Sequence, residues 1–189
     1  MNLKKQRTRE HILDKVYYLF AEKGFNAITM KDICIATDLS RGGLYSHFSS
    51  TGEVFEAILE KINQKEAMNF EEEINNGVSA ILILDNALQL MSDEMKHPED
   101  SLSLAMYEYA GKTGKELMNQ FNEIWSKKWK TLIEYGISTG EFKKVNVTEL
   151  LNIILYVYQG VRMWSRIVTL TSEDVDSVVL YVKRQLIKE

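Results

Sequence analysis

Four side chains that can bind nucleic acid lie within one short stretch of the sequence. Ser40, Arg41, Tyr45 and His47 bring together hydroxyl, guanidinium, phenol and imidazole groups. Each can donate a hydrogen bond to a phosphate oxygen, and Arg can bind a guanine edge with two hydrogen bonds. On a recognition helix, side chains of the first turn reach the base edges. This stretch therefore predicts contact with a DNA groove.

The surrounding residues predict two short helices, joined by a tight turn, that would position these groups. Thr29 and Asp32 have the spacing of a capping box at the start of the first helix. The turn falls at residues 38–39. Ser40 is the expected N-cap of the second helix, which should run to about His47. The sequence thus predicts a helix-turn-helix whose second helix carries the binding groups.

Apolar residues indicate which face of each short helix is buried. Ile33 and Ala36 are expected to form the apolar face of the first helix, while Leu44 and Phe48 should point inward from the second. The two glycines at 42–43 each cost the helix up to about 1 kcal/mol relative to Ala. Without side chains there, the backbone could approach DNA closely. A solvated helical corner without a ligand is the alternative.

Four stretches of the first sixty residues form a specific pattern when they are taken together. They are AEKGF at 21–25, TMKDI at 29–33, LSRGGLYSHF at 39–48 and SSTGEVFEAILE at 49–60. This pattern resembles the DNA-binding domain of the TetR family of bacterial transcriptional regulators. A weaker point of resemblance is IEYGISTGEF at 133–142.

The resemblance implies an all-α fold of about nine helices. Residues 1–51 would form a three-helix helix-turn-helix DNA-binding domain, and residues 52–189 a helical ligand-binding and dimerisation domain. The implied protein is a homodimeric repressor that binds double-stranded operator DNA. A small, largely apolar or aromatic effector would release it from the operator.

Composition and charge agree with this division. The chain has 189 residues, of which 45% are apolar, and its single Pro and ten Gly favour helices over sheet. The net charge of −4 excludes a uniformly basic nucleic-acid coat. Residues 1–51 hold eight Lys and Arg against five Asp and Glu, whereas the remainder holds fifteen against twenty-two. A basic head on an acidic body fits a small DNA-contacting module carried by a larger domain.

Cysteine content and hydropathy indicate the cellular compartment in which the protein is expected. Cys34 is the single cysteine, so no disulfide can form within the chain. The first three residues, Met-Asn-Leu, are followed by the basic residues Lys4, Lys5, Arg7 and Arg9, and the apolar core of a signal peptide does not come after them. No stretch reaches the roughly 18 apolar residues of a membrane span. We therefore expect a soluble, cytoplasmic protein with no membrane partner.

The pattern and the resemblance together give a set of DNA-binding residues. They are Lys4, Lys5, Arg7, Thr29, Lys31, Ser40, Arg41, Gly42, Gly43, Tyr45, Ser46, His47 and Thr51. Residues 1–7 are expected to form a disordered basic arm, for which a solubilising tail is the alternative. The first helix should begin near Thr8 and end at Lys23. At residues 51–52 the family often has Lys where this chain has Thr-Gly, which implies a weaker or backbone-mediated phosphate contact.

The rest of the chain reads as further helices. Their expected positions are residues 53–75, 78–95, 99–111, 115–137, 148–170 and 172–186. The helix at 148–170 is apolar on all sides and must be covered on more than one side. Together with the apolar stripe of 172–186, it predicts a homodimer joined through a four-helix bundle. Burial wholly within one chain is the alternative.

Met and aromatic residues are frequent between residues 65 and 168, where they can build either a core or an adaptable apolar pocket. With the resemblance, they predict an effector pocket lined by Met91, Met95, Met106, Tyr107, Phe121, Trp125, Trp129, Tyr156, Gln159 and Trp164. The polar groups that could orient the effector are Glu108, Asn122, Gln159 and Arg162.

Other classes of protein find little support. No His is arranged to activate Cys34, the three His are dispersed, and no nucleotide-binding loop appears. We therefore expect no catalytic residues, no metal and no cofactor. The alternatives that stay open are a helical protein-binding adaptor, a TetR-like regulator without an effector, and an activator. Salt-dependent affinity for duplex DNA separates a regulator from an adaptor.

Overall fold

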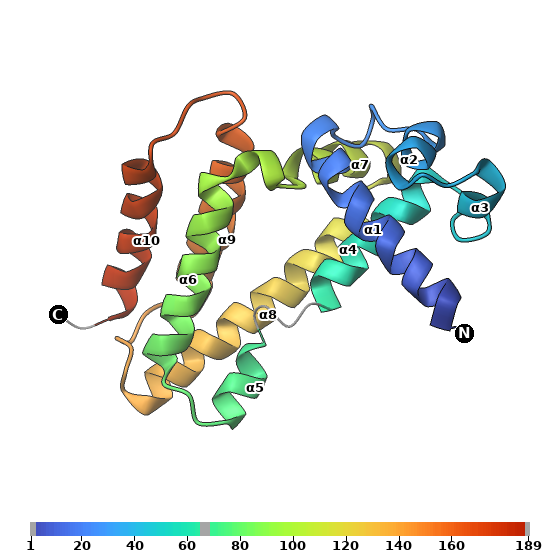
Figure 1. Cartoon of the computed structure of the whole chain (residues 1–189). Helices are drawn as coiled ribbons and strands as arrows, with labels where there is room; N and C mark the ends of the chain where they lie inside the picture. Colours follow the sequence, from blue (N-terminus) through green and yellow to red (C-terminus); the bar gives the residue numbers. More distant parts are fainter. Residues whose placement is uncertain (1–2, 65–68, 188–189) are drawn as a thin grey trace. The chain divides into compact units, whose positions relative to one another are not determined.

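The computed structural model describes residues 3–64 and 69–187, and these residues form ten α-helices, a short 3-10 helix and no β-strand. The chain folds into two compact units, whose helices are labelled in Figure 1. The first unit contains α1 (Leu3–Lys23), α2 (Met30–Thr37), α3 (Arg41–Tyr45), α4 (Thr51–Gln64) and α7 (Ser103–Thr113). The second contains α5 (Phe70–Asn75), α6 (Ala80–Lys96), most of α8 (Glu116–Thr139), α9 (Val147–Trp164) and α10 (Ser172–Leu186). The all-α fold is confirmed.

The 3-10 helix (Pro98–Asp100) precedes α7. None of the described helices has both the length and the apolar character needed to cross a membrane.

Side-chain caps delimit the two short helices as the sequence predicts. At α2 the backbone N–H of Thr29 donates to Asp32 Oδ2 at 2.9 Å, and the N–H of Asp32 donates to Thr29 Oγ1 at 3.3 Å. The Thr29 hydroxyl also donates to Asp32 Oδ2, and this bond, followed by the bond from the Thr29 N–H, lowers the pKa of the Asp32 carboxyl below its usual 3.8. Asp38 ends α2 in the left-handed region, with φ 56°. Ser40 then caps α3 by accepting the N–H of Gly43 at 3.1 Å.

The buried face of these helices differs from the expected one at a single position. Ile33, Leu44 and Phe48 are buried, as predicted. Ala36 is exposed, and the inward position belongs to Thr37 instead. Thr37 lies four residues after Ile33, on the same face of the helix. Its buried hydroxyl donates to the Ile33 carbonyl at 2.7 Å, which removes the cost of burying a polar group.

The expected disordered arm is wrong for residues 3–7, because α1 already begins at Leu3. Lys, Gln and Arg are good helix formers, and no Gly or Pro interrupts the sequence before Thr8. The helix therefore extends about five residues further toward the N-terminus than its apolar pattern indicates. The first two residues of the arm lie outside the described part.

Aromatic rings form the centre of the first unit. Phe20, Phe25 and Phe55 lie with ring centroids 5.0 to 6.0 Å apart. Tyr109 of α7 contacts Phe25 edge-on at 5.0 Å, and its hydroxyl donates to the carboxylate of Glu56. α7 therefore packs with the N-terminal helices, which its place in the chain does not indicate.

The single helix expected at residues 53–75 is wrong, because two helices occupy this region. α4 ends at Gln64, and α5 begins at Phe70. Asn69 caps α5 by accepting the N–H of Glu72 at 3.4 Å. An Asn side chain that binds the backbone in this way starts a new helix rather than continuing an old one. Residues 65–68 lie outside the described part.

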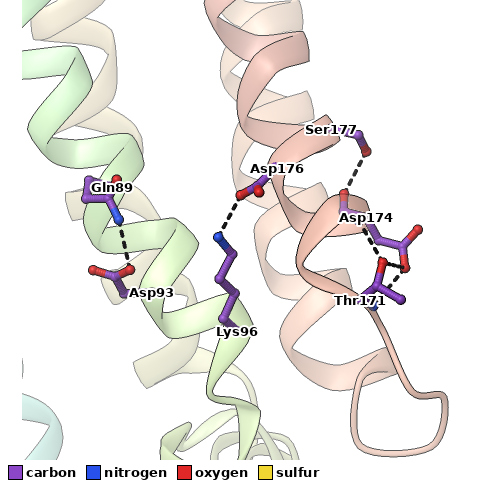
Figure 2. A network of polar contacts seen from close by, with 7 residues as sticks. All are labelled: Gln89, Asp93, Lys96, Thr171, Asp174, Asp176 and Ser177. Atoms are coloured by element: carbon purple, nitrogen blue, oxygen red, sulfur yellow. Dashed lines mark hydrogen bonds and ion pairs between the residues drawn. The ribbon is translucent and has the colours of Figure 1, made fainter.

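Apolar packing forms the core of the second unit, and ion pairs join its helices at the surface. Trp129 is 1% exposed and contacts the Phe70 ring edge-on, with centroids 5.6 Å apart. Figure 2 shows the ion pair between Lys96 of α6 and Asp176 of α10, with the charged atoms 2.6 Å apart. At the start of α10, Thr171 forms a capping box with Asp174, as the same view shows.

The motif at residues 136–142 ends α8, and its Glu141 side chain caps the start of α6. Gly140 adopts φ +79°, a conformation that Gly accepts without strain. Glu141 then accepts the N–H groups of Ala80 and the residue after it, at 3.1 and 3.2 Å. Desolvation alone would raise the pKa of the Glu141 carboxyl, but hydrogen bonds from Ser79, Ala80 and neighbouring groups lower it overall. Glu141 thus supplies hydrogen bonds that the start of α6 would otherwise lack.

Gly136→Ala is expected to destabilise the protein. A Cβ at this position would overlap the ring of Phe142, which is 2% exposed and has little space to move. Overpacking of this kind costs about 1 to 3 kcal/mol, more than the gain of up to about 1 kcal/mol from the helix propensity of Ala. Urea unfolding followed by circular dichroism measures the free energy of unfolding.

Gly111→Ala is the control for this prediction. Gly111 lies in α7, and nothing stands within 4 Å of an added Cβ. This variant should be as stable as the wild type or more stable. Equal stability of the two variants would contradict the overlap with Phe142.

Candidate nucleic-acid interface

The exposed side of α3 carries the side chains that the sequence singles out. Arg41 lies directly after the cap, in the first turn, and is exposed. Tyr45 follows one turn later and is 49% exposed. Leu44, the residue before Tyr45, is fully buried. Leu44 therefore packs the helix into the unit, while Arg41 and Tyr45 offer a guanidinium and a phenol to a ligand.

Hydroxyl groups around α3 serve mainly to shape the backbone. Ser40 accepts the N–H of Gly43, and the Ser46 hydroxyl donates to the Gly43 carbonyl at 2.7 Å. The Thr29 hydroxyl donates to Asp32 Oδ2 in the cap of α2. The hydroxyl proton of Ser40 can still donate to a phosphate oxygen. Gly42 is exposed, and an added Cβ there would meet nothing within 4 Å.

Cations of α1 and α2 complete the predicted set. Lys5, Arg7 and Lys31 are exposed. Burial first, and then the positive charges of Lys5 and Arg9, lower the pKa of His47 below 6.5. Burial and the neighbouring positive charges thus both favour the neutral form of this imidazole. The backbone of Lys4 belongs to α1, but its side chain lies outside the described part.

The exit from α3 is tied to α4. The N–H of Glu53 donates to Ser50 Oγ at 3.1 Å, and Ser49 donates its N–H and hydroxyl to Glu53 Oε2 at 2.7 and 2.8 Å. The hydrogen bonds from Ser49 lower the pKa of Glu53. Thr51, half-buried, is the first residue of α4. The Ser-x-x-Glu spacing of a capping box could have revealed the role of Glu53 from the sequence.

Glu108 is another residue whose role the sequence does not indicate. It lies on α7, and its carboxylate accepts the backbone N–H of Asn26 at 2.8 Å, in the corner before α2. The two residues are 82 positions apart. No local spacing signals such a contact.

The second unit contains an apolar cavity of about 310 Å³ between α6, α9 and α10. Met91 and Met95 line it from α6, Ile154 and Tyr158 from α9, and Val178 from α10. Two of the ten residues predicted for an effector pocket therefore lie at this cavity. The hydroxyl of Tyr158 donates to the carboxylate of Glu94.

The other predicted pocket residues are distributed over both units. Trp129 belongs to the core against Phe70. The side chains of Tyr107, Tyr156, Gln159 and Trp164 are exposed, and those of Met106, Phe121 and Trp125 are partly buried. Of the polar groups suggested to orient an effector, Arg162 forms an ion pair with Glu94 at 3.8 Å. Asn122 is exposed, and Glu108 binds Asn26.

Comparison with known proteins identifies the N-terminal region. Residues 12–58 match the family described as bacterial regulatory proteins, tetR family. The chain is similar to the uncharacterized HTH-type transcriptional regulator YfiR of Bacillus subtilis, with 26% identity over 75% of this chain and 71% of the relative. It is also similar to the HTH-type transcriptional repressor KstR2 of Rhodococcus jostii, with 26% identity over 74% of this chain and 70% of the relative.

Solved structures share the fold along nearly the whole chain. A TetR transcriptional regulator from Chloroflexus aurantiacus has a TM-score of 0.75 and 22% identity, over 98% of this chain and 99% of its own. Reduced Escherichia coli NemR has a TM-score of 0.78 and 14% identity, over 97% and 100%. The relatives are transcriptional regulators rather than enzymes. With its capped helix-turn-helix and helical second unit, the chain belongs to the TetR family and is a DNA-binding transcriptional regulator of that type.

Proposed function

We propose that the protein is a homodimeric repressor that a small, largely apolar ligand releases from its operator. The main support for a dimer is a group of exposed apolar side chains on two neighbouring helices of the second unit. On α9 they are Ile153, Tyr156, Val157 and Trp164, and on α10 they are Leu180 and Tyr181. We call these six residues the apolar patch.

Exposure of the apolar patch is high for side chains of this size. Tyr156 is 65% exposed and Trp164 is 57% exposed. The opposite side of α9 is already buried, with Ile154 at 2%. α9 and α10 pack together within the unit (Figure 1). Large exposed apolar patches are typical of protein interfaces, and a two-fold axis would place the same patch on both sides of a four-helix bundle.

A dimer would carry two copies of α3. Two recognition helices about 34 to 36 Å apart, or a multiple of that distance, enter successive major grooves on one side of B-DNA. Arg41 would read base edges, and Tyr45, Lys5, Arg7 and Lys31 would contact phosphates. Since such a dimer has two-fold symmetry, its operator should be close to palindromic.

The cavity between α6, α9 and α10 is the proposed ligand site. Its volume of about 310 Å³ lies at the lower end of the range for small-molecule pockets. Aliphatic and thioether side chains such as Met91, Met95 and Val182 dominate its lining, so it suits an apolar molecule. A ligand that binds the DNA-free conformation more tightly would weaken operator binding by the same factor by which DNA weakens ligand binding.

A regulator without an effector is the second candidate. Ile153, Val157 and Tyr181 both line the cavity and belong to the apolar patch. Side chains of a partner subunit could therefore fill the cavity in place of a ligand. A thermal-shift screen of apolar small molecules on the purified dimer separates the two candidates. A compound that raises the melting temperature and weakens DNA binding supports the effector.

The experiment that tests the proposal measures mass and DNA affinity together. Sedimentation equilibrium gives the mass of the full chain, and fluorescence anisotropy gives its affinity for duplex DNA over a series of salt concentrations. We expect a dimer whose logarithmic affinity falls linearly with the logarithm of salt concentration. A monomer that ignores duplex DNA in dilute salt would overturn the proposal.

A further inference from the structure

The recognition helix α3 is too short to hold its own position. It has five residues, two of them glycines, and only Leu44 is buried. Isolated helices of this length are unstable in water, and each Gly adds up to about 1 kcal/mol of cost relative to Ala. The cap at Ser40 fixes its first turn. Its far end must be held by residues from other helices.

Arg9 of α1 supplies such a contact at the far end. Its Nη1 donates to the backbone carbonyl of His47, two residues after α3, at 3.2 Å. The guanidinium carbon also lies 4.2 Å from the centre of the Phe48 ring. That ring is 1% exposed and anchors the segment in the core. One side chain therefore contacts both the backbone and the core anchor of the exit from α3.

The chemistry of the site matches an arginine. A planar guanidinium can stack on an aromatic face and donate a hydrogen bond sideways at the same time, which an ammonium group cannot do. Its positive charge lies next to carbonyl groups at a helix C-terminus, where cations are favoured. The same charge helps to lower the pKa of Glu53, the residue that binds Ser49 from α4. Arg9 and Glu53 thus hold the exit from α3 from two different helices.

We propose that Arg9 is a positioning residue for the recognition helix, and that operator affinity depends on it without a contact between Arg9 and a base. The proposal rests on the function of α3 as the DNA-reading helix. Without the Arg9 contacts, the end of α3 would sample several orientations. The observed affinity would then equal the intrinsic affinity multiplied by the fraction of molecules whose α3 keeps the binding-competent orientation.

A direct phosphate contact is the rival role, because Arg9 is only partly buried. Arg9→Lys separates the two roles. The variant keeps the charge for a phosphate but loses the planar fork that joins His47 and Phe48. A positioning residue is not replaced by Lys, whereas a phosphate contact largely is.

The experiment uses the full-length dimer and the duplex recovered most often from a random-sequence pool by the wild-type protein. Anisotropy titrations at several salt concentrations give the affinity and the salt slope of wild type, Arg9→Lys, Arg9→Ala and Lys15→Ala. Lys15 is an exposed cation on the same helix and serves as the control. Circular dichroism at the assay temperature establishes that each variant is folded. Hydrogen exchange reports the protection of the amides at 44–48.

We expect both Arg9 variants to bind the selected duplex about tenfold more weakly, which corresponds to the loss of one charge-assisted hydrogen bond. The salt slope of Arg9→Lys should stay at the wild-type value, and amides 44–48 should exchange faster. Lys15→Ala should bind as the wild type does. Wild-type affinity in Arg9→Lys, or unchanged exchange at 44–48 in Arg9→Ala, would overturn the proposal. If the wild type itself selects no duplex, it is the DNA-reading role of α3 that fails.

Discussion

Tyr156→Glu is expected to convert the protein to a monomer and to weaken operator binding by a factor of about 100 or more. Tyr156 lies in the apolar patch and is 65% exposed in the single chain, so the variant should fold. In a dimer, a carboxylate at this position would be buried next to its symmetry mate, at a high desolvation cost. Loss of the second recognition helix removes the gain of two-headed binding, which typically amounts to 10² to 10⁴.

Sedimentation equilibrium and anisotropy titration of the same samples measure this effect. Leu82→Glu is the matched control, because Leu82 is 53% exposed on α6 and lies outside the apolar patch. It should remain dimeric and bind DNA as the wild type does. Ile153→Glu tests a second position of the patch. If Tyr156→Glu and Ile153→Glu both remain dimers and bind DNA with wild-type affinity, the interface lies elsewhere.

Arg41→Ala is expected to reduce sequence discrimination by about 1 to 3 kcal/mol, which is the usual contribution of an Arg that binds guanine with two hydrogen bonds. Arg41 is exposed in the first turn of α3, where side chains reach base edges. The ratio of affinities for the selected duplex and for a scrambled duplex of the same composition measures this discrimination. The variant should lose most of that ratio while its binding to the scrambled duplex changes little.

Tyr45→Phe provides the comparison for Arg41→Ala. On the proposed role of Tyr45 as a phosphate contact, removal of its hydroxyl should weaken binding to both duplexes by a similar amount, about 0.5 to 1.5 kcal/mol. The ratio of affinities should therefore stay near the wild-type value. An unchanged ratio in Arg41→Ala would remove Arg41 from base recognition.

The local features of the fold could be predicted because they depend on residues a few positions apart. The capping box of Thr29 with Asp32 and the cap at Ser40 follow from spacing alone, and the structure has both. The same reasoning failed where propensity and caps had to be weighed against each other. α1 begins as early as Leu3 because no Gly or Pro interrupts the residues before Thr8. Asn69 starts a new helix, α5, inside a stretch with helical periodicity.

Long-range contacts were beyond such reasoning. Arg9 meets His47 across 38 positions, and Glu108 meets Asn26 across 82. Neither pair has a spacing that a helix or a turn would enforce. The effector pocket shows the same limit, since Met and aromatic residues look alike in a sequence whether they line a cavity, as Met91 does, or fill a core, as Trp129 does.

A selection of random duplexes on the purified full-length protein tests the central claim most directly. If two copies of α3 read DNA from a symmetric dimer, the recovered sequences should form an inverted repeat. The centres of its half-sites should lie about 10 to 10.5 base pairs apart, or a multiple of that spacing. A pool that shows no enrichment, or that converges on a single unrepeated site, would contradict the account.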